Sequence, residues 1–171
     1  MFDEYTDRIH RDYLRSLSLK YEILEKSEPK LCGLPLSRLM NYPRGIARDI
    51  CAEAIVLLSE ISLHRLYFES FSEKGELYCQ KQIEDRVGSL SSFIYDMKNA
   101  SLKLRRGFVS IGRGRNGVEF RASEDFTEHF VEFFPLLTID LCEHAYFVEY
   151  GFNTERYLDS MISHLRFSLI L

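Results

Sequence analysis

Hydrophobic residues recur at the spacing of an α-helix over most of the first half of the chain. In residues 3–26 they predict a first long helix. The polar residues 26–35 contain two prolines and a glycine, which end that helix, and a short amphipathic piece follows at 36–41. A second apolar stripe, from about residue 46 to residue 71, predicts the longest helix of the chain. Two long helices with a polar connection predict an antiparallel hairpin.

The period of the pattern changes in the second half of the chain. Residues 73–80 predict a linker, and residues 81–105 predict a helix that Gly88-Ser89 divides into two. After Gly107 apolar and polar residues alternate, as in β-strands. Strands are predicted at residues 108–112, 118–122 and 135–140, the first two joined by a turn at Asn116-Gly117, and residues 141–168 supply closing helices.

These elements predict an α+β fold, in which an antiparallel helical hairpin precedes a three-stranded antiparallel sheet flanked by helices. We place the boundary at the linker, which gives an N-terminal α-hairpin lobe (residues 1–72) and a C-terminal α/β lobe (residues 73–171). A chain of 171 residues is long enough to bury a substantial core.

Composition excludes several classes of protein. A net charge of −4 and a pI near 5.8 give no electrostatic basis for a nucleic-acid surface. No apolar run approaches the roughly 20 residues that span a bilayer, and the acidic N-terminus is unlike a signal or transit peptide. The four cysteines show no C-x-x-C pair or zinc spacing, which fits a reducing compartment. We therefore expect a cytoplasmic protein that binds neither nucleic acid nor a membrane.

The candidate chemistry begins where the third strand ends. The apolar run PLLTI leads into Asp140, and His144 follows four residues later as the pattern becomes helical. An aspartate at a strand end and a histidine one turn into the next helix can converge on one metal ion. The same spacing also occurs with an N-cap aspartate and a surface histidine, so the pair alone does not identify a site.

The string DLCEHAY (residues 140–146) resembles the D-x-W-E-H-A-Y signature of the iron/manganese superoxide dismutases, with Cys142 in place of the tryptophan. The flanking PLLTID and FVEYGFNTERYLDSMI resemble that family's last strand and C-terminal helix. In the family, the aspartate and histidine of this signature are two of the four protein ligands of one metal ion. The resemblance therefore implies that Asp140 and His144 are metal ligands.

The resemblance extends along nearly the whole chain. SLHRLYF (residues 62–68) is similar to the family's N-H-T-F-Y-W motif, which implies His64 as a third ligand. IEDRVGSLSSF (residues 83–93) and RRGFVSI (residues 105–111) resemble the segments that lead into the family's sheet. FDEYTDRIHRDYL (residues 2–14) resembles the first-helix motif M-E-x-H-x-x-K-H-H-x-x-Y-V.

The fourth ligand depends on the register of the first helix. If Tyr13 occupies the family's gateway tyrosine, which relays protons, Tyr5 falls where the ligand histidine belongs. The number of residues between Tyr13 and Pro43 is typical of the corresponding family positions, which favours this register. The alternative makes His10 the ligand and places Ser18 at the gateway. A tyrosinate ligand would favour the +3 ion and lower its reduction potential.

Two further residues take roles from the resemblance. Glu60 stands where iron-type members have a glutamine bonded to the metal-bound solvent, and we interpret it with Tyr13 as a catalytic pair. Glu143 corresponds to a glutamate that reaches the partner subunit's ligand histidine, which implies a homodimer.

The chain has thirteen phenylalanines, ten tyrosines and no tryptophan. The family's tryptophans are replaced by Cys142, by Phe68 and by Phe108 with Ser110. Phenylalanine keeps the apolar volume but not the indole N–H.

The resemblance implies a divergent superoxide dismutase, an antioxidant oxidoreductase that converts superoxide to O₂ and H₂O₂ with one iron or manganese ion per chain. The alternative is a non-catalytic or metal-poor protein of the same fold that acts as a structural subunit, and a weaker one is a metal oxidase with altered chemistry. The three matched ligands and Tyr13 favour metal binding.

Overall fold

The computed structural model describes residues 4–72 and 80–171, and within them it has the predicted α+β architecture. The α-helices are α1 (Glu4–Ser27), α2 (Leu36–Leu39), α3 (Arg48–Glu69), α4 (Gln80–Val87), α5 (Leu90–Ser101), α6 (Glu143–Tyr150) and α7 (Thr154–His164). The strands are β1 (Phe108–Gly114), β2 (Gly117–Ser123) and β3 (Phe134–Asp140). Short 3₁₀ helices occupy η1 (Pro29–Leu31), η2 (Phe126–Phe130) and η3 (Phe167–Ile170).

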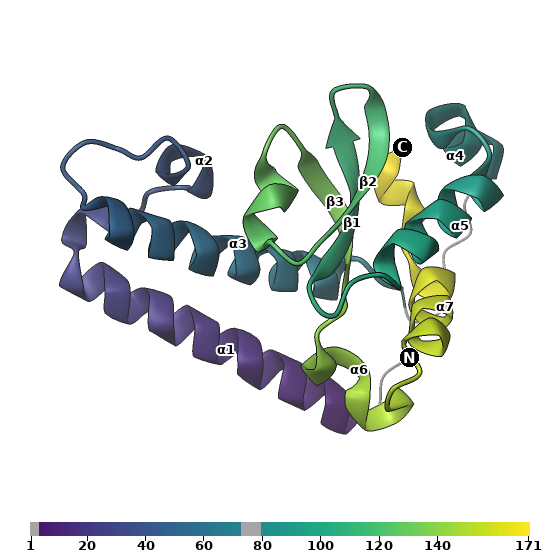
Figure 1. Cartoon of the computed structure of the whole chain (residues 1–171), viewed down its shortest axis with the longest axis horizontal. Coiled ribbons are helices and arrows are strands. Elements are labelled where there is room, and N and C mark those ends of the chain that lie inside the picture. The colour runs from purple at the N-terminus through teal and green to yellow at the C-terminus, as the bar shows by residue number, and fades with distance from the viewer. Residues whose placement is uncertain (1–3, 73–79) are drawn as a thin grey trace.

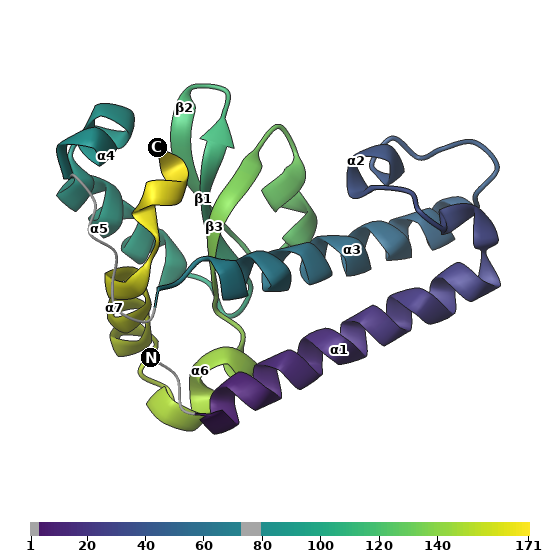
Figure 2. The same cartoon turned by 180° about the vertical axis from the view of Figure 1, so that it is seen from behind.

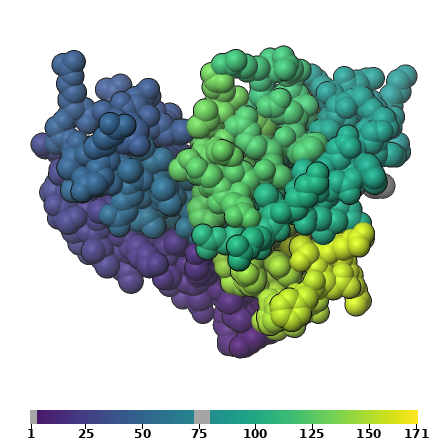
Figure 3. Space-filling model, viewed as in Figure 1, coloured from purple at the N-terminus to yellow at the C-terminus, as the bar shows by residue number. Residues whose placement is uncertain are grey.

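Helices α1 and α3 lie side by side as the predicted antiparallel hairpin (Figures 1 and 2). The sheet stands beside the second half of α3, with α4, α5 and α7 on its other side, and α6 lies against the start of α1. Figure 3 shows the hairpin at one side of the molecule and the sheet with the C-terminal helices at the other. The first helix therefore reaches from the hairpin tip to the segment that follows β3.

The lengths of the two long helices differ from the prediction. The prediction that the second long helix is the longest is wrong, because α1 has 24 residues and α3 has 22. The linker predicted at residues 73–80 lies, except for its last residue, outside the described residues.

The predicted break at Gly88-Ser89 is present and has a local cause. Gly88 has a φ of +77°, which ends α4 at a conformation that glycine adopts without strain. The Ser89 hydroxyl then accepts a hydrogen bond from the Ser92 amide at 3.3 Å and begins α5. The two helices meet at a corner that turns the chain towards the sheet.

The sheet has the order β2-β1-β3 and is antiparallel throughout. Strand β1 is central, so its pairing with β3 places Phe108 opposite Asp140. The Leu141 amide continues the pairing by donating to the Gly107 carbonyl at 2.8 Å. Gly107 has a φ of +120°, and a Cβ there would clash with the Ser123 carbonyl, so this position needs glycine. These contacts fix the chain at the point where Asp140 leaves the sheet.

Buried apolar residues form two groups. One fills the space between the sheet and α4, α5, α6 and α7, and the other fills the hairpin between α1, α2 and α3. The boundary predicted between residues 72 and 73 stays a prediction, since 73–79 are not described. Among the described residues, no helix is both long enough and apolar enough to cross a bilayer.

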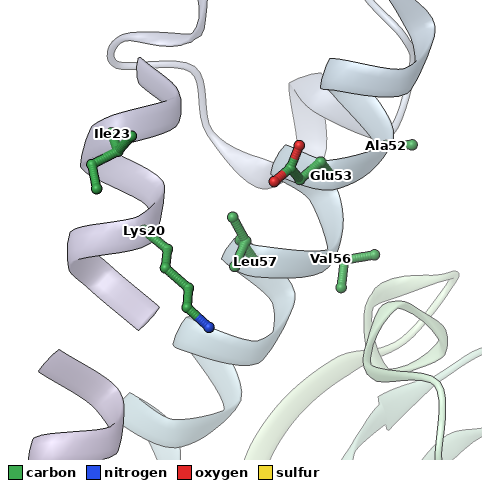
Figure 4. A pocket seen from close by; sticks show the side chains of 6 residues that line it. All are labelled: Lys20, Ile23, Ala52, Glu53, Val56 and Leu57. Carbon is green, nitrogen blue, oxygen red and sulfur yellow. The ribbon is translucent and has the colours of Figure 1, made fainter. Parts of the chain in front are cut away.

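A groove of about 630 Å³ lies between α1 and α3 (Figure 4). It is lined by Lys20 and Ile23 of α1 and by Ala52, Glu53, Val56 and Leu57 of α3. Its lining includes none of His10, His64, Asp140 and His144.

The segment after β2 buries a histidine. His129 in η2 is fully buried, with its ring 6.5 Å from the Phe108 ring. Burial, with a smaller contribution from the nearby Arg121 guanidinium, lowers the pKa of His129 from 6.5 to about 4. The folded protein therefore holds this imidazole neutral at a pH where the unfolded chain protonates it.

This burial predicts a loss of stability in weak acid. Because the folded pKa is depressed, the contribution is fully present above pH 6.5 and is lost as pH falls towards 4, by about 3 kcal/mol in total. Urea unfolding of the metal-free protein at pH 7 and pH 5 measures it. We expect His129→Gln to lose less stability over this interval than the wild type, and equal losses would contradict the prediction.

Candidate metal centre

Helix α1 brings two side chains to one place. His10 is buried and Tyr13 is half-buried, and residues three apart lie on the same face of a helix. The sequence alone presents His10 as ligand and Tyr13 as gateway as alternatives, but the structure brings both in together. Ser18, the gateway in the second register, instead donates its hydroxyl to the Leu14 carbonyl.

The structure places Tyr5 outside this site, which corrects the favoured assignment of Tyr5 as a ligand. Its side chain is 52% exposed, and the Arg8 guanidinium lies 5.2 Å from its ring centroid. Five residues before His10, Tyr5 is turned by about 140° from it around the helix, so one straight helix cannot aim both inward. His10, the alternative, takes the position.

Helix α3 supplies His64 from its buried face. The Nδ1 atom of His64 lies 2.8 Å from the backbone carbonyl of Glu60, one turn earlier, to which it donates. This bond leaves Nε2 as the atom that faces inward, where it lies 3.1 Å from His144 Nε2. The helix backbone thus fixes the tautomer that presents a bare lone pair to the site.

Asp140 and His144 come from the end of β3 and the first turn of α6. Asp140 is fully buried, and its Oδ1 accepts a hydrogen bond from the Cys142 amide at 2.8 Å. Its Oδ2 lies 2.9 Å from His144 Nε2. The strand end and the helix start therefore point these two side chains at one another, as the spacing of four predicts.

The four side chains converge on one small volume. Asp140 Oδ2 lies 3.0 Å from His10 Nε2, 3.2 Å from His64 Nε2 and 2.9 Å from His144 Nε2. All four atoms lie within 4.8 Å of one another. An ion with bonds of about 2.1 Å would hold its ligand atoms about 3–4 Å apart, which is this spacing.

The donor set fits a transition metal better than it fits a network of hydrogen bonds. His10 Nε2 is buried and, although close to Asp140, makes no hydrogen bond of ordinary geometry. The Nδ1–H of His64 donates a hydrogen bond to the Glu60 carbonyl. In the neutral ring, Nε2 therefore carries a lone pair, and this lone pair faces a carboxylate oxygen. A cation bound by these atoms would give the His10 Nε2 atom a partner and would remove the repulsion between the His64 lone pair and the carboxylate oxygen. Three imidazoles and one carboxylate suit iron or manganese.

The electrostatics of the group favour a charged carboxylate. Burial alone would raise the pKa of Asp140, but the three histidines hold it well below its usual value. Burial also lowers the pKa of His10, which keeps that imidazole unprotonated. Burial also acts to lower the pKa of His64, but the effect of the Asp140 carboxylate is larger and the pKa of His64 is raised.

A second layer of side chains surrounds the four. The Tyr13 hydroxyl donates to Glu60 Oε1 at 2.8 Å, and the Tyr13 ring stacks on His144 with centroids 4.1 Å apart. Glu60 is only 7% exposed, and burial together with this bond raises the pKa of Tyr13. Phe108 contacts the His64 ring edge-on at 5.1 Å and Phe68 lies 5.0 Å from His10. The predicted pair Tyr13 and Glu60 thus lies against the ligands.

The outer face of α6 is apolar. Glu143 is exposed beside the partly exposed His144, and Phe147 and Val148 follow at 44% and 50% exposure. Phe152 is 93% exposed and packs edge-on against Phe147. Helix α6, which carries Phe147 and Val148, lies against the start of α1 (Figures 1 and 2).

Sequence reasoning missed two tyrosines near the group. Tyr67, one turn beyond His64, packs on the His10 ring with centroids 4.4 Å apart. Tyr157 in α7 donates its hydroxyl to the backbone carbonyl of Asp140 at 2.7 Å. Helical spacing marks Tyr67 as a core residue, and only the fold brings Tyr157 to Asp140.

Comparison with known proteins points to one family. The sequence profile of the iron/manganese superoxide dismutases, C-terminal domain, matches residues 74–170. The proteins named superoxide dismutase [Fe] from Aquifex pyrophilus and from Aquifex aeolicus are each 28% identical over 134 residues. Each alignment covers 72% of this chain and 61% of the relative. The chain thus aligns with less than two thirds of each relative's length.

Proposed function

Because the chain belongs to the iron/manganese superoxide dismutase family, we propose that it binds one iron or manganese ion and converts superoxide to O₂ and H₂O₂. The ligands are His10, His64, Asp140 and His144. The observation that carries this proposal is the convergence of three Nε2 atoms on Asp140 Oδ2 at 2.9–3.2 Å.

The reaction needs one group that exchanges electrons and others that supply protons. A bound iron or manganese ion would take an electron from one superoxide and give an electron to another. Two superoxide ions and two protons then give one O₂ and one H₂O₂. The three histidines and Asp140 hold the ion, and the protein's remaining task is to deliver protons to the reduced oxygen.

Tyr13 and Glu60 are placed for that task. The raised pKa keeps the Tyr13 phenol protonated, and its hydrogen bond to Glu60 Oε1 fixes the hydroxyl beside the His144 ring. Glu60 is also bound through its backbone to His64 Nδ1, so the pair moves with the ligands. We assign Tyr13 and Glu60 the role of holding and passing protons at the site.

The family resemblance of Glu143 extends the proposal to a homodimer in the cytoplasm. The apolar face that Phe147, Val148 and Phe152 present beside Glu143 suits a second copy of the chain. A two-fold axis there would bring each Glu143 near the partner's site. Free thiols at the described cysteines Cys32, Cys51 and Cys142 fit a reducing compartment.

Superoxide decay measured by pulse radiolysis tests the activity in protein loaded with iron or with manganese. We expect catalysed decay with at least one of the two metals, and Tyr13→Phe should slow it by about tenfold or more while metal content is unchanged. Tyr21→Phe, on the same helix but within the hairpin core, is the matched control and should leave the rate unchanged. A fully loaded wild-type protein without catalysed decay would contradict the proposed function.

A further inference from the structure

Hydrogen bonds fix Asp140 in addition to its contacts with the three histidines. Its Oδ1 accepts from the Cys142 amide, and the next amide, that of Leu141, donates to the Gly107 carbonyl at 2.8 Å. Its own backbone carbonyl accepts from the Tyr157 hydroxyl at 2.7 Å. Bonds on both sides of the residue leave Oδ2 as the carboxylate oxygen aimed at the three histidines.

Tyr157 is the side chain among these partners that lies outside the sheet and the turn after it. It is fully buried on α7, stacked on Tyr146 with ring centroids 4.8 Å apart and met edge-on by Tyr150 at 5.5 Å. These two rings, both from α6, hold the Tyr157 ring in place. Its hydroxyl therefore reaches the Asp140 carbonyl in a fixed orientation.

Tyr67 lies behind Tyr157, and the two phenols interact. A carbonyl has no proton, so the single hydroxyl proton of Tyr157 goes to Asp140. Burial raises the pKa of both phenols well above the usual value, so both protons are retained.

Tyr67 also contacts His10, a second ligand of the proposed site. It lies on α3 one turn after His64, and its ring packs against the buried His10 ring at 4.4 Å. One side chain thus supports His10 by packing and Asp140 through Tyr157. The contacts join α3, α7, the end of β3 and α1 around one point.

We propose that Tyr157, with Tyr67 packed behind it, is a positioning residue that sets the direction of the Asp140 carboxylate and thereby the affinity and geometry of the metal site. The proposal rests on the proposed metal-binding function. Neither tyrosine touches the reacting atoms, and each acts through a ligand. Loss of an outer partner of this kind typically lowers metal affinity 10–100-fold.

The test uses the full chain and Co²⁺ as the probe, because its visible absorption reports ligand geometry. We expect Tyr157→Phe to raise the Co²⁺ dissociation constant by about 10–100-fold and to change the visible spectrum. Tyr67→Phe should raise the constant by a smaller factor. Because Tyr67 acts on Asp140 through Tyr157, the double variant should bind no more than about twofold more weakly than Tyr157→Phe alone.

Tyr150→Phe is the matched control, since Tyr150 contacts the same ring but gives its hydroxyl to Ser160 at 3.1 Å. It should bind Co²⁺ as the wild type does. If Tyr157→Phe changes thermal stability but leaves both affinity and spectrum unchanged, the proposal is overturned and the tyrosine is only structural. A wild-type chain that binds no Co²⁺, iron or manganese would instead overturn the metal site itself.

Discussion

Replacing His64 with alanine is expected to abolish stoichiometric iron or manganese binding. The substitution removes one of four ligand atoms and one of the three imidazoles around the fully buried Asp140 carboxylate. The loss of affinity should exceed the 10–100-fold that is typical of outer-shell partners, so we expect more than about 100-fold. Metal content after dialysis against a weak chelator measures it.

His164→Ala is the control for this substitution. His164 ends α7, where its Nδ1 lies 2.8 Å from the Ser160 carbonyl, and it does not belong to the group of four. It should retain the wild-type metal content. A His64→Ala protein that folds and still carries one metal ion per chain would show that the ion is bound elsewhere.

The second large effect separates the two registers of the first helix. His10→Ala should lose the metal as His64→Ala does, because the buried His10 Nε2 lies 3.0 Å from Asp140 Oδ2. Tyr5→Phe should change neither metal content nor the visible spectrum of the iron-loaded protein, since Tyr5 is 52% exposed. The pair of variants is measured by elemental analysis and absorption spectroscopy.

The opposite pattern would restore the register with a tyrosine ligand. In that case Tyr5→Phe would remove a tyrosinate-to-iron absorption band, and His10→Ala would leave it intact. Tyr42→Phe provides a comparison, because Tyr42 is a similarly exposed phenol in the loop before α3.

Most of the fold could be predicted from local patterns in the sequence. The helical hairpin follows from apolar stripes with a period of 3.6 residues, and the three strands follow from the change to a period of 2 after Gly107. The corner at Gly88 follows from the chemistry of helix ends, which acts within a few residues. Such signals lie close together in the chain and need no tertiary information.

The candidate site could be predicted only in part. His64, Asp140 and His144 stand in motifs long enough to align, and the structure brings them together. The first-helix motif aligns in two registers, and matching letters alone does not show which helix face points inward. Helical geometry places His10 and Tyr13 on one face, so the structure combines the histidine of one register with the tyrosine of the other.

Long-range contacts account for what the sequence did not reveal. Tyr157 acts on Asp140 across 17 residues of chain, and Tyr13 meets Glu60 across 47. No periodicity predicts such pairs, because packing of α1, α3 and α7 around the end of β3 creates them.

Elemental analysis of the purified protein tests the central claim most directly. The geometry of His10, His64, Asp140 and His144 predicts about one iron or manganese ion per chain. A folded protein that contains neither metal, and that takes up neither when both are offered during refolding, would contradict the metal site and the dismutase function together.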